Sequence, residues 1–111
     1  MSGVDVIIPT YRIPVGDLSK CIDSVLAQTL KPTTIRVLDA TPVSDTDYSK
    51  LRAMIDSKVG VQYVRQTGKG LSQARNQAIE MGSSTYIALL DGDDWWYPHH
   101  LERLVDMAEN S

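Results

Sequence analysis

The sequence contains very little cysteine: Cys21 is the single one among 111 residues. A lone cysteine excludes a disulfide within the chain and any metal site built from cysteines alone, and it fits a reducing compartment. Long apolar runs are also missing, since no stretch approaches the roughly 18 residues that span a bilayer. The N-terminus has neither the basic nor the apolar block of a signal peptide. We therefore expect a cytoplasmic location, or the cytosolic face of a membrane if a longer parent protein is anchored.

Charge of one sign is not in excess either. Eleven basic and 14 acidic residues give a formal net charge of -3, which gives no reason to expect nucleic acid or an anionic membrane as partner. What is present is ordinary for a globular protein, with 42% apolar and 23% charged residues. The length fits one domain over residues 1–111 with a small core.

Short apolar runs alternate with segments of helical period along the whole chain. The apolar runs predict strands at residues 4–8, 34–39, 61–64 and 85–91. Apolar residues recurring every three or four positions predict helices at about residues 18–26, 48–55, 71–81 and 98–108. The order βαβαβαβα predicts an α/β fold with a mostly parallel sheet and helices on its faces.

Capping residues and prolines predict where these elements begin and end. Pro9 is expected to end the first strand, and Asp17 is expected to cap the N-terminus of the first helix. Gly82 suits the C-cap of the third helix, and Pro98 suits the first position of the last one.

Ligands of such sheets bind beyond the carboxyl ends of the strands. The residues expected at these ends are Pro9 to Arg12, Asp39, Arg65 to Gly70 and Asp91 to Asp94. Three of these four strand ends lead to groups that could bind a ligand.

Three carboxylates, Asp91, Asp93 and Asp94, follow the fourth predicted strand within four residues. An Asp-x-Asp at a strand end can aim two carboxylates at one point, where a hard cation such as Mg²⁺ or Mn²⁺ takes oxygen ligands. Gly92 allows a tight backbone between the acids. The alternative is an acidic turn, because aspartate and glycine form turns in many proteins. The position after a buried strand favours the metal site.

Asp39 and the glycine loop each allow two interpretations. A carboxylate at Asp39 can accept from a nucleobase N–H or a ribose hydroxyl, or it can cap the turn that follows it. The segment from Thr67 to Gly70 places glycines and a lysine at a helix entrance, where free N–H groups favour an anion. Arg75 lies one turn further and could reach a phosphate. A flexible turn with a solvated arginine is the alternative.

The remaining candidates favour structural roles. Adjacent residues of a helix point about 100° apart, so His99 and His100 cannot readily share one metal ion and fit surface or capping positions. Trp95 and Trp96 could form a wall against a sugar, although one of them, and Tyr97 as well, is expected to pack in the core. Cys21 lies on the apolar stripe of its helix and is expected in the core.

Taken together, these segments resemble the N-terminal half of family 2 glycosyltransferases, which invert configuration and have the GT-A fold. The resemblance extends along nearly the whole chain in order. The segments that carry it are VDVIIPTYR, CIDSVLAQTLKP, IRVLDATPVSDTD, GLSQARNQAI and LLDGDDWWYPHHLERLV.

The resemblance implies a Rossmann-like half-domain that binds a nucleotide-diphosphate sugar, most often a UDP-sugar. It implies that Pro9, Thr10 and Asp39 contact the base and ribose, beside Tyr11 of the same turn, and that Arg75 faces the nucleotide. It also implies that Asp91 and Gly92 lie near ribose and metal, and that Asp93 is the main ligand of Mn²⁺ or Mg²⁺. The cation then bridges the two phosphates and offsets charge on the departing nucleotide.

The chain departs from the family pattern in two respects. Ala40 replaces the second acid of the usual turn after the second strand, and Arg12 replaces the usual Asn or Glu. The acceptor-binding half and the catalytic carboxylate of the family lie beyond the Asp-x-Asp segment, so we expect a chain that is incomplete at its C-terminus. The catalytic base is unassigned, the acceptor is unknown, and exposed sheet surface predicts self-association.

Two other functions fit the same pattern less well. A non-catalytic module of this fold would bind only a nucleotide or a protein partner. A receiver or another flavodoxin-like domain shares the alternation and the clustered aspartates. A receiver, however, needs acids after its first strand and an aspartate after its third, where this chain has Pro9 and Arg65.

Overall fold

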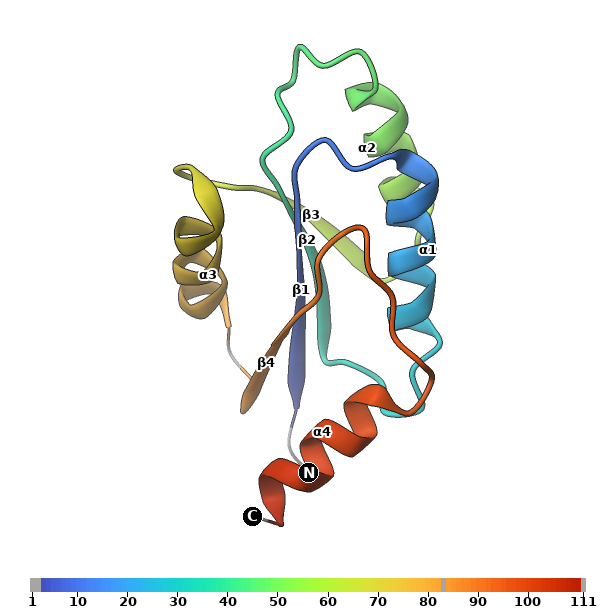
Figure 1. Cartoon of the computed structure of the whole chain (residues 1–111), viewed down its shortest axis with the longest axis vertical. Helices are drawn as coiled ribbons and strands as arrows, with labels where there is room; N and C mark the ends of the chain where they lie inside the picture. Colours follow the sequence, from blue (N-terminus) through green and yellow to red (C-terminus); the bar gives the residue numbers. More distant parts are fainter. Residues whose placement is uncertain (1–2, 83, 111) are drawn as a thin grey trace.

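The computed structural model describes residues 3–82 and 84–110 of the chain. These residues form four parallel strands in the order β3-β2-β1-β4, so the predicted α/β architecture is confirmed (Figure 1). The elements in chain order are β1 (Val4–Thr10), α1 (Val15–Leu26), β2 (Thr34–Asp39), α2 (Tyr48–Asp56), β3 (Val61–Arg65), α3 (Gly70–Met81), β4 (Tyr86–Leu89) and α4 (His100–Glu109).

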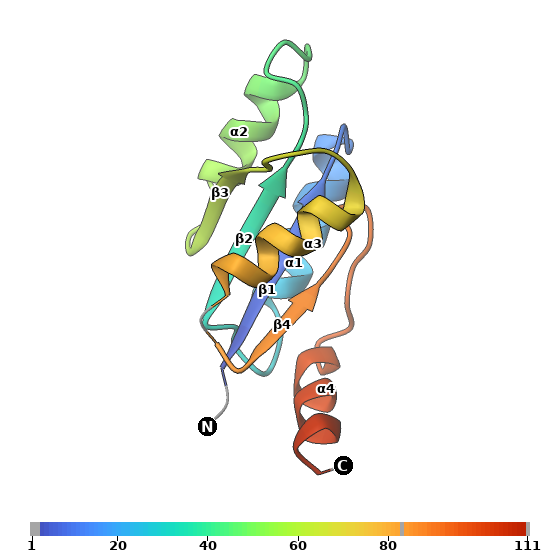
Figure 2. The ribbon, with the colours of Figure 1, turned by 90° about the vertical axis from the view of Figure 1, so that its left-hand side faces the viewer.

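The helices cover both faces of the sheet. Helices α1 and α2 lie on one face and α3 lies alone on the other, while α4 lies near the amino ends of the strands (Figures 1 and 2). All four strands run in the same direction, so their carboxyl ends meet at the opposite edge. The edge far from α4 is therefore where a ligand site is expected.

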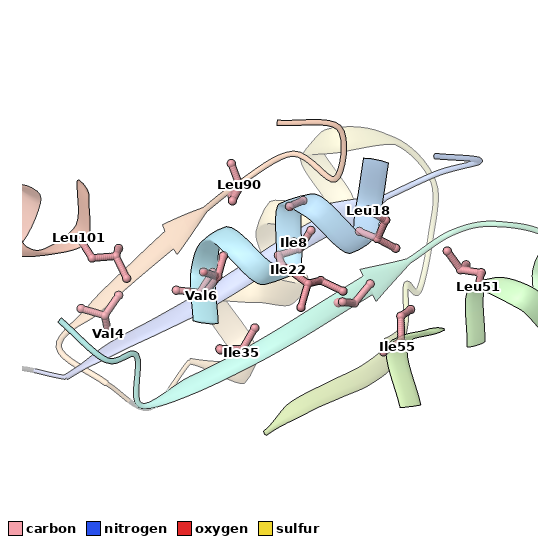
Figure 3. Close-up of a cluster of buried hydrophobic side chains, with 13 residues drawn as sticks. Val4, Val6, Ile8, Leu18, Ile22, Ile35, Leu51, Ile55, Leu90 and Leu101 are labelled. Atoms are coloured by element: carbon pink, nitrogen blue, oxygen red, sulfur yellow. The ribbon is translucent and has the colours of Figure 1, made fainter. Parts of the chain in front are cut away.

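The core is divided by the sheet into two layers. Val4, Val6 and Ile8 of β1 point toward α1 and α2 (Figure 3), whereas the intervening Ile7 packs with Leu38 under α3. This alternation follows from the two-residue period of a strand. Cys21 belongs to the first layer and is fully buried, as predicted.

The prediction that Pro9 ends the first strand is wrong, because β1 continues to Thr10. Pro9 pairs with Leu38 in the register of β2, and its carbonyl accepts from Gly92 N–H on the side of β4. Its nitrogen also faces β4, but that strand has already ended at Leu89. The missing N–H therefore falls just beyond the last β1–β4 pair, Ile7 with Leu89, where a proline disturbs the ladder least.

Two of the predicted helix starts are also wrong. Helix α1 begins at Val15 after Pro14, and Asp17 lies in its first turn, where a negative charge is still favourable. Helix α4 begins at His100, two residues after Pro98. The carbonyl of Pro98 accepts from Thr29 N–H at 2.8 Å, so it is turned away from the helix. Gly82 caps α3 as predicted.

The start of α4 is fixed by Gln28, a fully buried polar residue after α1. Its amide nitrogen donates to the carbonyl of Tyr97 at 2.7 Å and to that of Ser24 at 3.0 Å. Its amide oxygen accepts from Leu101 N–H at 2.9 Å. One side chain thus satisfies buried backbone groups of two elements about 70 residues apart in the chain.

Replacing Gln28 by alanine is expected to lower the free energy of unfolding by about 2 kcal/mol, because a buried N–H and two carbonyls lose their partner. Chemical denaturation of the variant measures this loss. Thr29→Ala is the matched control, since its hydroxyl makes exposed hydrogen bonds at the same junction and should cost less than about 1 kcal/mol. Equal losses in the two variants would contradict the assigned role of Gln28.

Two surface properties bear on the remaining expectations. Within residues 3–82 and 84–110, none of the helices combines the length and apolarity that crossing a bilayer demands. Ile87 and Leu89 on the edge strand β4 are 36% and 39% exposed. This apolar edge is the feature on which the prediction of self-association rests.

Candidate functional site

A cleft of about 710 Å³ opens at the carboxyl ends of β1, β2 and β3, under the start of α3. A second hollow of about 280 Å³ shares Pro9 and Leu71 with it and extends to the end of β4. The cleft is lined by Pro9, Thr10, Tyr11, Ala40, Pro42, Arg65, Gln66, Gly68, Lys69, Gly70, Leu71 and Ala74. The predicted edge of the sheet therefore carries two adjoining concave surfaces.

The acids after β4 converge as the sequence predicts. One carboxylate oxygen each of Asp91, Asp93 and Asp94 lies within 4.8 Å of the others, and all three residues are exposed. A turn brings them together, since Asp94 N–H donates to the carbonyl of Asp91 at 2.9 Å. Three hard oxygen donors open to solvent fit Mg²⁺ or Mn²⁺, which usually keeps waters and phosphate oxygens in its shell. Asp94 joins the two predicted ligands as a third candidate.

Gly92 is needed in this turn for space. It is buried, and its N–H donates to the carbonyl of Pro9 at 3.2 Å. A Cβ added there would lie 3.0 Å from the hydroxyl of Thr10 and 3.3 Å from the side chain of Leu18. Gly92 is not among the residues with positive φ, so close packing against β1 and α1, rather than a left-handed backbone, accounts for it.

Cys21 packs against the acidic turn, and its thiol is unreactive at neutral pH. Its thiol donates to the carbonyl of Asp91 at 3.5 Å. Burial, followed by the charges of Asp94, Asp93 and Asp91, raises the pKa of the Cys21 thiol to about 12. A thiol that stays protonated is neither a nucleophile nor a metal ligand at neutral pH.

We expect Cys21 to resist alkylation by iodoacetamide at pH 8 in the folded protein. The raised pKa keeps the thiol neutral between pH 8 and about 12, and its side chain is inaccessible. Mass spectrometry after labelling with and without urea measures this. The unfolded chain should be labelled readily, because an ordinary cysteine has a pKa of about 8.5. Rapid labelling of the folded protein would contradict this assignment.

Asp39 lies beneath the cleft and is fully buried. Its Oδ1 accepts from Thr41 N–H at 2.9 Å, which is the turn cap considered from the sequence. Its Oδ2 accepts from the hydroxyl of Tyr63 at 2.6 Å and from Nη1 of Arg65 at 3.3 Å. Both carboxylate oxygens thus have donors within the protein, and Asp39 does not line the cleft itself.

Arg65 and Tyr63 form a charged network around Asp39 that the sequence analysis missed. Nη1 of Arg65 also donates to the carbonyl of Thr41 at 2.6 Å and to the hydroxyl oxygen of Tyr63 at 3.0 Å. The hydrogen bond with Tyr63 raises the pKa of Arg65, while burial, followed by the hydrogen bond with Asp39, raises the pKa of Tyr63. The sequence placed Arg65 at this edge of the sheet, directly after the predicted strand, but carried no signal of its pairing with Asp39.

The glycine loop and Arg75 line different hollows, and Leu71 lines both. Gly68 and Gly70 have φ of 79° and 82°, which residues with a side chain rarely adopt, so both glycines are required by the turn into α3. Lys69 lines the larger cleft between them. Arg75 is exposed and lines the smaller hollow with Asp91 and Asp94.

The aromatic residues after the acids divide between core and surface. Trp96 packs against the first core layer, which confirms the expectation for one tryptophan, and it stacks on His100. Trp95 is 45% exposed, with the ammonium of Lys20 5.1 Å from its ring centre. Tyr97 is 73% exposed, so the expectation that it packs in the core is wrong. His99 is exposed and occupies the N-cap position of α4 without a capping hydrogen bond from its side chain, which agrees with the predicted surface or capping position.

Sequence comparison identifies the family to which this chain is similar. The family model described as glycosyl transferase family 2 matches residues 5–111. An uncharacterized glycosyltransferase, EpsJ of Bacillus subtilis, is 35% identical over 97% of this chain and 31% of its own length. WfgD of Escherichia coli is named as a UDP-Glc:alpha-D-GlcNAc-diphosphoundecaprenol beta-1,3-glucosyltransferase and is 33% identical over 94% of this chain and 40% of its own.

Structural comparison agrees on the fold. The crystal structure of Staphylococcus aureus TarS residues 1–349 in complex with UDP superimposes with a TM-score of 0.71 over 97% of this chain, at 17% identity. This chain covers 32% of that structure. The chain thus spans less than half the length of both EpsJ and WfgD.

Proposed function

Since the chain belongs to glycosyl transferase family 2, we propose that it binds the nucleotide-diphosphate sugar of a glycosyltransferase, with a UDP-sugar as the donor. The observation that carries this proposal is the convergence of the Asp91–Asp94 turn, Arg75 and the end of β1 on adjoining hollows. A relative named for transfer from UDP-Glc and a neighbour crystallised with UDP support the uridine nucleotide.

The proposed roles follow from position along the edge of the sheet. Asp91 and Asp93 hold Mn²⁺ or Mg²⁺, which would neutralise the diphosphate and its leaving charge. Arg75 lies on the other side of the same hollow and stabilises phosphate oxygens. Gly92 keeps the acidic turn packed on β1.

The nucleoside is placed in the larger cleft. Pro9, Thr10 and Tyr11 line the wall formed by β1, and Asp39 supports the floor of the cleft through its network. Tyr11 is 57% exposed and offers a ring face to base or ribose. The backbone N–H groups around Gly68 to Gly70 give a further polar surface under α3.

Transfer of the sugar requires more than binding of the donor. Inversion at the anomeric carbon needs a base that deprotonates the acceptor hydroxyl as it attacks. We assign this base to none of the described residues, and the acceptor, whether saccharide, lipid or protein, is equally unassigned. The donor-binding step is the part that this chain's own residues account for.

Calorimetry of the chain with UDP, in Mn²⁺ and in chelator, tests the proposed function. We expect binding in Mn²⁺ that weakens at least about 100-fold when the metal is removed, because the diphosphate then meets uncompensated carboxylates. Equal binding of UDP with and without metal would contradict the metal site. Absence of any binding would contradict the donor site and favour a protein-interaction module of the same fold.

A further inference from the structure

Arg65 lines the nucleotide cleft, whereas Asp39 is buried behind it. Asp39 is fully buried, and both of its carboxylate oxygens accept from Thr41, Tyr63 and Arg65. The side chain of Arg65 remains 42% exposed and lines the cleft. A ligand entering the cleft therefore meets the guanidinium, and the carboxylate behind it has already been satisfied.

Arg65 lies far from the metal ligands along this edge of the sheet. The sheet order β3-β2-β1-β4 separates Arg65 on β3 from Asp91 after β4 by three strand spacings. At about 4.8 Å per spacing this is roughly 14 Å, comparable to the length of an extended nucleoside diphosphate. With the diphosphate near Asp91, as the proposed function requires, the base lies near Arg65.

The hydrogen bonds of Arg65 leave donors for a ligand. Among the described residues, its side-chain hydrogen bonds all use Nη1, which donates to Asp39, Tyr63 and the carbonyl of Thr41. A guanidinium carries five N–H donors and no acceptor, so Nε and Nη2 can still donate to a ligand. Anchoring of Nη1 at three oxygens fixes the plane of the guanidinium before any ligand arrives.

We propose that Arg65 determines base preference by donating to a carbonyl oxygen of the nucleobase, while Asp39 positions Arg65 from behind. Uracil offers carbonyl oxygens at both positions next to its N3. Cytosine carries an amino group in place of one of them, and this donor would face the donors of Arg65. The inference rests on the proposed donor site and deepens it, because it names the residue that distinguishes UDP from CDP.

Calorimetry of UDP, CDP and inorganic pyrophosphate in Mg²⁺ tests this inference on wild type, Arg65→Ala and Arg65→Lys. Pyrophosphate contains no base and reports the metal end of the site alone. We expect Arg65→Ala to weaken UDP about 10-fold, the effect of losing one hydrogen bond to a charged group. Its preference for UDP over CDP should approach 1, with pyrophosphate unchanged. Arg65→Lys should retain part of the preference, since one cationic donor remains.

The role of Asp39 has its own readout. Asp39→Asn should reduce the preference for UDP over CDP with pyrophosphate binding unchanged, whereas a merely structural defect would weaken all three ligands together. Thermal melting identifies variants that are unfolded at the temperature of the titration. These variants are then titrated at a lower temperature, at which they are folded.

Each pattern of results decides between the alternatives. An unchanged preference for UDP over CDP in Arg65→Ala overturns the inference and leaves the donor site intact. Parallel loss of UDP and pyrophosphate in that variant assigns Arg65 to the phosphates, which also overturns it. Failure of wild type to bind UDP and pyrophosphate in Mg²⁺ or Mn²⁺ overturns the proposed function itself.

Discussion

Asp93→Ala is expected to weaken UDP binding in Mn²⁺ by at least about 100-fold, to the level that wild type shows in chelator. The carboxylate oxygens of Asp91, Asp93 and Asp94 lie within 4.8 Å of one another, so removal of one leaves an incomplete set of ligands. The remaining acids then repel the diphosphate without a cation to offset them. Calorimetry in the presence and absence of Mn²⁺ measures both effects on the same sample.

Asp106→Ala provides the matched control for this experiment. Asp106 is an exposed aspartate of α4, near the opposite end of the sheet, so its removal changes the net charge equally without touching the acidic turn (Figure 1). Its affinity for UDP should stay within about 2-fold of wild type, as expected for a screened distant charge. Retention of metal-dependent binding in Asp93→Ala would show that Asp93 is not a ligand.

Asp39→Ala is expected to lower the free energy of unfolding by about 3 kcal/mol. The substitution leaves Nη1 of Arg65, the hydroxyl of Tyr63 and Thr41 N–H without their shared acceptor. The partial exposure of Arg65 allows water to reach its guanidinium, which keeps the expected loss at the lower end of the range for a broken buried ion pair. Urea denaturation measures the loss.

Asp45→Ala serves as the control for an ion pair in the same region. Asp45 pairs with Arg12 at 3.5 Å, but the Arg12 side chain is 56% exposed. An ion pair open to solvent contributes little, so this variant should lose less than about 1 kcal/mol. A comparable loss in both variants would mean that burial of Asp39 does not determine its contribution.

The order of elements could be predicted because the apolar pattern of this chain is regular. Alternation in β1 and the helical stripe of α1 each bury the residues that the period indicates, as Figure 3 shows for Val6, Ile8, Leu18 and Ile22. The ends of helices and strands depend on contacts between distant segments, so they were harder to predict from the sequence. The start of α4 is set by hydrogen bonds from Gln28 and Thr29, and no pattern local to Pro98 carries that information.

The candidate site was predictable where one rule places residues together. Parallel strands bring their carboxyl ends to one edge, which is why Thr10, Arg75 and Asp91 could be expected around adjoining hollows. The sequence could not show that Asp39 is enclosed by Tyr63 and Arg65, because hydrogen bonding between side chains of β2 and β3 depends on their register.

NMR spectroscopy of the isotopically labelled chain with UDP and small amounts of Mn²⁺ tests the central claim most directly. The paramagnetic ion broadens nuclei near its binding site. We predict loss of signal for Asp91 to Asp94 first and then for Thr10 and Arg75, while Met107 on α4 remains sharp. Broadening centred on any other part of the chain, or equal broadening throughout, would contradict a single metal-bound diphosphate at the carboxyl ends of the strands.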